Sequence, residues 1–442
     1  MTANLGKRFF FLCVALALVV VSLTLTGRGL ADVAAQTGQT KTLDRDLEPV
    51  IIQGSRVSAL IGAPTNRLYV YTFTGDTRNS TPIPAQVDEV TGDGDYTNSE
   101  DGVLDANDEI VFMAGDTGDQ PSDTSSLDSW AEIDTSSWYE IEVVDPTSGK
   151  KGWAYLVRRN SPASIGSDYV DYNDGTSQIT TSPHRYRLGF SATHLGFDYL
   201  TLPAGSTQDL LDRTKVRVSY LSLDATEENV PFSNPAEIID GPVRAIIQQF
   251  GFGPGNIATT YLAYGSMVHS LVAVDSGISV SSVRTSIDLN DSASGGTFYN
   301  QNVSGGVTID GSPDTVAQTP FSNWAQVSHA NGRLIQVADA TPLGGTPKNY
   351  YCDDTTSPVE CDSTVKTGDG FAYGDAGILV EGGVNRTAVF SSTLYVLPPA
   401  GGGESDNVGS TYADYFAKPL FTMVFLKGER HTIFLPVVLK VW

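Results

Sequence analysis

Alternation of apolar and polar side chains is the clearest local pattern in the chain. From Tyr139 to Val144, apolar residues alternate with glutamates, and a second apolar run extends from Trp153 to Val157. The residues between them, Asp145–Gly149, read Asp-Pro-Thr-Ser-Gly, a composition typical of a tight turn. Because successive side chains of a strand point to opposite faces, this pattern predicts a β-hairpin.

Short runs of apolar and β-branched residues recur along the rest of the chain, separated by Gly, Pro and polar turn residues. They predict strands over 57–61, 68–73, 85–87, 110–114, 169–172, 185–190, 216–221, 243–250, 259–264, 269–274, 283–289, 324–328, 334–338, 377–380 and 388–396. One helical turn is expected over 208–213. Many short strands at close spacing favour an all-β fold with antiparallel sandwiches.

We expect two antiparallel β-sandwich domains, the second larger than the first. Ser, Pro and Gly cluster over 160–166, which divides an acidic N-terminal domain (48–162) from the larger sandwich (163–397). Residues 36–47 are polar and predict a flexible lead-in, and 398–409 form a Pro/Gly/Ser linker. The remaining segment, 410–442, predicts a short helix, a hairpin and an apolar tail.

The N-terminal residues 1–35 have the organisation of a secretory signal peptide. Lys7 and Arg8 precede an apolar run that ends near Leu25, and Val33-Ala34-Ala35 offers small residues for cleavage. A retained membrane anchor is the alternative, since the run approaches the length of a membrane span. With cleavage, we expect a secreted protein, extracellular or at the cell surface, with no membrane span.

The net charge of the chain argues against two classes of binding partner. The formal net charge of −24 repels nucleic acid phosphates and anionic membranes. From residue 79 to 149 there are 18 acidic residues and no Lys or Arg, so bound cations are a simple compensation. A solvated acidic surface is the competing interpretation of these residues.

One acidic stretch has the spacing of a calcium loop. Calcium binds six to eight oxygens, and an EF-hand loop supplies them at alternate positions around a central glycine. Gly102 falls at that glycine position, and the candidate ligands are Thr97, Ser99, Asp101, Val103 through its carbonyl, Asp105 and Asp108. The stretch resembles the calcium loops of EF-hand and dockerin-like modules, which implies a structural calcium site.

Two positions of this stretch depart from the EF-hand pattern. Thr97 replaces the usual first aspartate, and Asp108 stands where a longer glutamate is common, with Glu109 adjacent. Asp93 and Asp95, just upstream, could supply the missing charge. An acidic loop without a bound ion is the alternative interpretation.

The two cysteines that follow the signal segment, Cys352 and Cys361, lie in a turn-rich loop. In an oxidising compartment this spacing predicts a disulfide that closes the loop. The absence of a histidine near either cysteine in the sequence argues against a zinc site.

Catalytic motifs give little guidance, since the chain lacks the common nucleophile, zinc and phosphate signatures. The most enzyme-like segment contains His184, Tyr186 and Arg187. A polysaccharide lyase needs a Tyr or His base and a cation near the sugar carboxylate, so these residue types are suitable. A half-buried strand with exposed arginines is the competing interpretation.

Several short segments together resemble a group of uncharacterised secreted bacterial β-sandwich proteins. They are 84–89, 100–109, 152–156, 239–244, 305–311 and 370–374. This resemblance implies a secreted β-rich protein and transfers no activity.

Three functional hypotheses follow. The first is a calcium-stabilised cell-surface or matrix protein that binds a glycan or another surface component. The second is an extracellular polysaccharide-cleaving enzyme, a lyase or a hydrolase. The third is a structural protein that assembles through its C-terminal hairpin. The sequence leaves open whether the protein is an enzyme.

Overall fold

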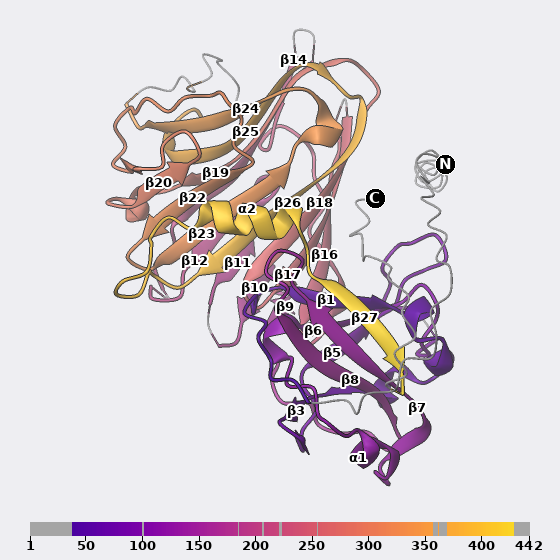
Figure 1. Cartoon of the computed structure of the whole chain (residues 1–442). Coiled ribbons are helices and arrows are strands. Elements are labelled where there is room, and N and C mark those ends of the chain that lie inside the picture. Colours follow the sequence, from indigo (N-terminus) through magenta and orange to yellow (C-terminus); the bar gives the residue numbers. More distant parts are fainter. Residues whose placement is uncertain are drawn as a thin grey trace, which may run out of the picture.

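The computed structural model describes residues 38–427 except 100, 184, 206, 221–222, 254, 357–360 and 362–368. The fold is all-β, with several antiparallel sheets and a short C-terminal helix, as the sequence predicts. Figure 1 shows a smaller unit, formed mainly by the N-terminal part of the chain, and a larger unit above it. In the described part of the chain, no helix has the length and hydrophobicity needed to cross a lipid bilayer.

The smaller unit, called the N-terminal unit below, is a sandwich of two sheets with strand orders β1-β6-β5 and β2-β8-β7-β27. The bounds are β1 Pro49–Gln53, β2 Leu68–Tyr71, β5 Ala85–Asp88, β6 Glu109–Met113, β7 Ile133–Val144, β8 Lys151–Arg159 and β27 Phe421–Leu426. A two-stranded ribbon, β3 (Phe73–Thr74) with β4 (Thr77–Arg78), lies beside them. Side chains of both sheets interdigitate in one apolar core that includes Ile110, Ile141 and Leu156.

The C-terminal strand completes a sheet of the N-terminal unit. β27 pairs antiparallel with β7, from Phe421 opposite Val144 to Leu426 opposite Tyr139. Figure 1 shows this strand running down from the larger unit to join β7. The second strand of the hairpin expected here, near 432–435, lies outside the described residues.

Residues 57–61 are helical rather than extended, so the strand expected there is wrong. They lie mostly in a 3-10 helix, η2 (Gly54–Leu60), in which Gly54, Val57 and Leu60 are buried. The backbone of Val57 is not helical (φ −124°, ψ 47°), so the element consists of two short 3-10 turns joined by a kink at this residue. The backbone of Gly54 also approaches the carbonyl of Asp105 so closely that a Cβ would not fit.

The polar residues before β1 pack against the N-terminal unit where the structure describes them. Gln39 forms an isolated antiparallel bridge with Gln120, and the side chains of Leu43 and Arg45 are buried. The flexible lead-in expected over 36–47 is therefore held by specific contacts from residue 39 onward.

The large unit contains a nine-stranded antiparallel sheet with strand order β15-β16-β17-β18-β26-β23-β22-β20-β21. Its strands are β15 Ala236–Asp240, β16 Arg244–Gly251, β17 Gly255–Tyr264, β18 Met267–Ser276, β20 Thr297–Asn300, β21 Val307–Thr308, β22 Trp324–His329, β23 Gly332–Asp339 and β26 Thr387–Leu397.

Two smaller sheets pack against one face of the nine-stranded sheet. The five-stranded sheet consists of β13 (Leu211–Tyr220), β14 (Leu223–Thr226), β19 (Val280–Leu289), β24 (Gly344–Asp354) and β25 (Ala372–Val384), in the order β14-β13-β19-β25-β24. The four-stranded sheet consists of β9 (Val170–Asn173), β10 (Gln178–Thr181), β11 (Arg187–Phe190) and β12 (Phe197–Thr201). Two apolar clusters fill the layer between these sheets and the nine-stranded sheet.

Residues 211–213 begin a strand, so the helical turn expected over 208–213 is wrong. β13 pairs with β19 from Leu211 opposite Leu289 onward, and the register shifts between Leu211 and Arg213. Asp212 is therefore an extra residue in a β-bulge. Pairing with β19 outweighs the local helical pattern.

The outer face of the nine-stranded sheet holds the two units together. Val111 and Met113 of β6 pack there with Ile246 and Tyr264, and the C-terminal helix α2 (Gly409–Ala417) adds Ala413 to the same cluster. Figure 1 shows α2 lying over this sheet, where it packs on β22 and β23. The short elements that remain are α1 Ser125–Asp128, η3 Thr65–Arg67, η4 Ala114–Asp116, η5 Asp291–Ala293 and η6 Thr341–Leu343.

Candidate functional site

The predicted calcium loop lies between β5 and β6. Asp101 accepts a hydrogen bond from the backbone of Val103, and Thr97 and Ser99 hydrogen-bond through their hydroxyls. Asp108 is buried and accepts hydrogen bonds from the backbones of Val90 and Asp105. Burial raises the pKa of the Asp108 carboxyl, and repulsion by Asp105 and Asp101 adds to the shift. The loop thus gathers like charges, and calcium binding there stays a prediction.

Tyr186 and Arg187, two of the three residues considered for lyase chemistry, do not share a surface. His184 lies outside the described residues. Tyr186 is buried, and its hydroxyl donates a 2.6 Å hydrogen bond to the carbonyl oxygen of Tyr264. Arg187, the next residue, is exposed. Tyr186 therefore connects the four-stranded sheet to the nine-stranded sheet, and nothing in its geometry adds support to a role as catalytic base.

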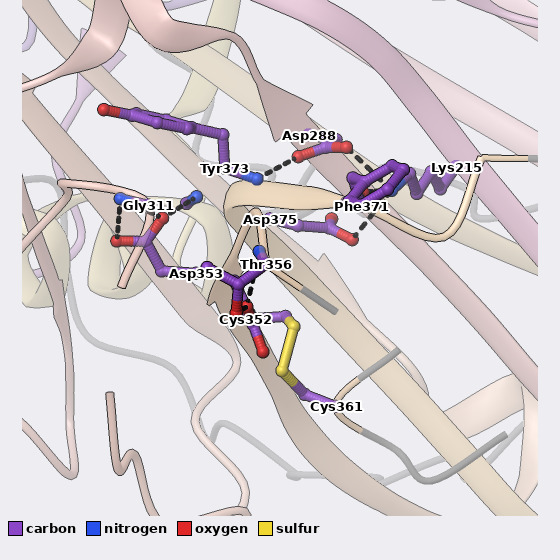
Figure 2. The surroundings of a disulfide bond; sticks show 12 residues. Lys215, Asp288, Gly311, Cys352, Asp353, Thr356, Cys361, Phe371, Tyr373 and Asp375 are labelled. Atoms are coloured by element: carbon purple, nitrogen blue, oxygen red, sulfur yellow. Dashed lines mark hydrogen bonds and ion pairs between the residues drawn. A yellow bond between two sulfur atoms is a disulfide. The ribbon is translucent and has the colours of Figure 1, made fainter. Parts of the chain in front are cut away.

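Cys352 and Cys361 form a disulfide, as the sequence predicts. The bond joins β24 to the segment that connects β24 with β25 (Figure 2). Its surroundings contain an unusual concentration of buried charge, which is described next.

One face of the five-stranded sheet is polar and carries several buried charges. On β13, Arg213, Lys215 and Arg217 alternate with Thr214 and Val216 and so point to one face. The cross-strand register places Asp288 and Arg284 of β19 on this same face, and Asp375 of β25 lies there too, 3.8 Å from Nζ of Lys215. The opposite face of the sheet faces the nine-stranded sheet and is apolar.

Lys215 lies at the centre of this polar face with a fully buried side chain. Its Nζ lies 2.7 Å from Asp288, 2.9 Å from Asp369 and 3.8 Å from Asp375, and it also donates to the carbonyl oxygen of Phe371. Burial alone would lower the pKa of Lys215, but Asp375, Asp288 and Asp369 together raise it above its ordinary value. Lys215 is therefore a permanent cation inside a group of carboxylates (Figure 2).

Asp288 is the carboxylate of this group whose ionised form is disfavoured by its surroundings. Burial, followed by repulsion from Asp375, raises the pKa of its carboxyl well above the ordinary range, although Lys215 opposes the shift. Its other oxygen accepts a 2.8 Å hydrogen bond from the backbone of Tyr373. Because these bonds fix both oxygens, the carboxyl is held in one orientation.

A second buried ion pair extends the polar face. Arg217 pairs with Glu227, and its guanidinium also donates a 2.8 Å hydrogen bond to the backbone carbonyl of Asp369. Arg284 lies over the ring of Tyr350, with 4.1 Å between the guanidinium carbon and the ring centroid. Residues 369–371 therefore take part in this network through both side chain and backbone.

A pocket of about 640 Å³ opens where β12 meets the start of β13. Its lining is Thr193, His194, Asp198, Asp209, Leu211, Asp212, Arg213, Glu228 and Asn290. The volume lies within the range of sites that bind small ligands. Leu211 is the one aliphatic residue of this lining, so the pocket is polar.

Hydrogen bonds fix several residues of the lining in place. Asp209 accepts from the backbones of Leu200 and Leu211 at 2.9 and 3.1 Å. The guanidinium of Arg213 bonds to Asp212 at 2.7 Å and to Glu228. Such a preorganised polar wall is suited to a ligand that carries several hydroxyl groups.

Sequence reasoning predicted parts of β13, β19 and β25, missed β12 and β24, and did not recognise the charged face of this site. The signal was present in the run from Arg213 to Val218, where every second residue is cationic. A strand with cations on one face and Val on the other predicts an exposed polar face. Only the tertiary structure shows that residues 369–371 contact this face and that its cations are buried.

No protein-family model and no curated protein matches the sequence. Among solved structures, the chain is similar to an α-N-acetylgalactosaminidase, NagBb from Bifidobacterium bifidum, with 14% identity and a TM-score of 0.36 over 54% of this chain and 38% of that one. It is also similar to a bacterial glucoamylase complexed with acarbose, with 8% identity and a TM-score of 0.34 over 63% of this chain and 38% of that one. The chain thus spans well under half of either protein, and likeness at this level supports no statement about activity.

Proposed function

We propose that the protein works outside the cell as a calcium-stabilised binding protein for a neutral glycan, which it holds in the pocket at the β12–β13 junction. The observation that carries this proposal is the lining of the pocket. Carboxylate, amide, hydroxyl and imidazole groups surround about 640 Å³, with little apolar surface. Sugars present many hydroxyls and are recognised by groups of this kind, since carboxylates accept strong hydrogen bonds from them.

The charge of the lining favours a neutral or amino sugar over an acidic one. Asp198, Asp209, Asp212 and Glu228 stand against one arginine, Arg213, which is already paired. A uronate or sulfated sugar would be repelled by this excess of negative charge. Phosphate-bearing ligands are disfavoured for the same reason.

An extracellular location agrees with two features of the chain. The disulfide Cys352–Cys361 is of a kind that persists in oxidising compartments. The first 35 residues have the organisation of an export signal. At the calcium concentration outside cells, the acidic loop Thr97–Asp108 would be occupied if its affinity matches that of extracellular calcium modules, and the ion would offset repulsion within the loop.

The first prediction tests the glycan pocket with Asp198→Asn. Asp198 lies on β12 and is half-buried in the lining. Loss of a hydrogen bond to a charged group costs about 1.5–3 kcal/mol, so we expect the affinity for a neutral glycan to fall by about ten- to a hundredfold. A glycan array identifies the ligand, and calorimetry then compares the variant with the wild type.

Asp174→Asn is the matched control, because Asp174 is an exposed aspartate between β9 and β10 and does not line the pocket. It should leave binding unchanged. Equal affinity in both variants, or a preference of the wild type for uronate polymers, would refute the proposal. Release of new reducing ends during the assay would instead favour a polysaccharide-cleaving enzyme.

A further inference from the structure

Three carboxylates from separate parts of the large unit converge beside the pocket. Asp212 comes from the bulge in β13, Asp288 from β19 and Asp369 from the segment before β25. One oxygen of each lies within 4.8 Å of the others. Calcium–oxygen distances of about 2.3–2.6 Å place opposite ligands of one ion about 5 Å apart, so a single cation can contact all three.

A second observation concerns Asp375, whose side chain is fully buried next to this triad. Within the described part of the chain, neither of its carboxylate oxygens has a hydrogen-bond partner. Its nearest cation is Nζ of Lys215 at 3.8 Å, beyond hydrogen-bond length. Figure 2 shows Asp375 and Asp288 directed toward Lys215. A buried carboxylate without hydrogen bonds indicates that positive charge is missing here.

The local charges confirm this imbalance. Among the described residues, five carboxylates, those of Asp212, Glu228, Asp288, Asp369 and Asp375, are connected through two cationic side chains, Lys215 and Arg213. Lys215 already bonds to two of them, which fixes Asp288 and Asp369 but leaves an excess of negative charge. A divalent cation bound to Asp212, Asp288 and Asp369 would offset this excess.

We propose that Asp212, Asp288 and Asp369 bind a hard divalent cation of the calcium type, with Asp375 as a buried counter-charge. The donor set contains oxygen atoms only, which suits calcium and disfavours zinc or copper. Asp212 belongs both to the triad and to the pocket lining, so the cation borders the pocket. This site is separate from the loop Thr97–Asp108 and does not depend on glycan binding.

The test is calorimetric titration of calcium alone into the full chain after removal of metal by a chelator. The background is a variant with Asp101→Asn and Asp105→Asn, in which the loop of the N-terminal unit has lost two candidate ligands. We expect this background protein to bind one calcium ion. Adding Asp212→Asn or Asp369→Asn should lower its affinity on the order of tenfold, because each removes one ligand charge.

Asp212 and Asp369 are chosen because both are partly exposed, so substitution should leave the fold intact. Near-ultraviolet circular dichroism without metal checks this point, and Asp174→Asn on the same background serves as control and should not alter affinity. If the background protein binds no calcium, or if Asp212→Asn and Asp369→Asn bind it as well as the control does, the proposal is wrong.

Discussion

Arg45 shows how much one buried side chain connects. Its guanidinium bonds to Glu48 at 2.6 Å and to Asp145 at 3.1 Å, and it donates to the backbone carbonyls of Tyr415 and Lys418. It also lies over the ring of Tyr415, 4.2 Å from the centroid. One residue of the N-terminal segment thereby holds the end of α2, some 370 positions later in the chain.

The pH dependence of stability should reveal Glu48, its partner. Burial raises the pKa of the Glu48 carboxyl from 4.5 to about 7, although Arg45 opposes the shift. Since the folded state holds this proton more tightly than the unfolded state, the contribution of Glu48 is fully present below pH 4.5 and is lost as pH rises to about 7. The loss should be about 3 kcal/mol.

The measurement compares the unfolding free energies of the wild type and Glu48→Gln in urea between pH 5 and pH 8. Because glutamine does not titrate, the wild type should lose stability relative to the variant across this interval. A difference that stays constant with pH would contradict the assigned role of Glu48.

At the scale of elements, the five-stranded sheet is buried on both faces with opposite chemistry. Its apolar face packs on the nine-stranded sheet, whereas its polar face contains buried ion pairs, such as those of Lys215 and Arg217. Burial of ion pairs costs desolvation energy, and the cost is recovered only when geometry is closely controlled. The strands must therefore keep their register and spacing at this point.

Gly377 provides a test of that spacing. It lies on β25 opposite Ser286, and a Cβ there would lie 2.1 Å from the carbonyl oxygen of Thr285 and 2.6 Å from the Cα of Ser286. Gly377→Ala should therefore push β25 away from β19 and lower the unfolding free energy by about 1–3 kcal/mol. Chemical denaturation measures the loss.

Gly277→Ala is the matched control, because a Cβ at Gly277 meets no atom within 4 Å. It should leave stability unchanged within about 0.5 kcal/mol. Equal effects of the two substitutions would show that β25 can move without cost.

On the scale of the whole molecule, the contact between the two units resembles a domain core. Besides the apolar cluster, Arg244 of β16 bonds to Asp88 of β5 and Glu109 of β6, both at 2.6 Å, and all three groups are largely buried. Gln86 accepts hydrogen bonds from the backbones of Val243 and Arg244. The units should therefore unfold together in one calorimetric transition.

Arg244→Met tests this coupling. It leaves Asp88 buried without a cation, so we expect a loss of about 3–5 kcal/mol and separation of the single transition into two. Adding Asp88→Asn should restore part of the loss, since it removes the uncompensated charge. Arg386→Met, at an exposed position, should cost less than about 1 kcal/mol. A single transition retained in Arg244→Met would argue against electrostatic coupling.

Local patterns in the sequence determined the all-β class, many of the strands, the C-terminal helix and the disulfide, but they did not predict β12, β14, β15 or β24. The hairpin of β7 and β8 follows from alternation and turn residues within twenty positions, and a disulfide nine positions apart needs no distant information. The local sequence pattern gave the wrong secondary structure at 57–61 and 208–213, where contacts with residues distant in sequence determine the backbone conformation. In both places contacts with residues far along the chain outweighed the local preference.

The candidate site depended on tertiary structure almost entirely. Asp212, Asp288 and Asp369 are separated by 76 and 81 positions, and only the pairing of β13, β19 and β25 brings them together. The sequence by itself determined which residues could form strands and which side chains alternate along them. The tertiary structure decided which faces are buried, because burial depends on the element that packs on each face. The alternation of side chains along a strand carries no information about that element.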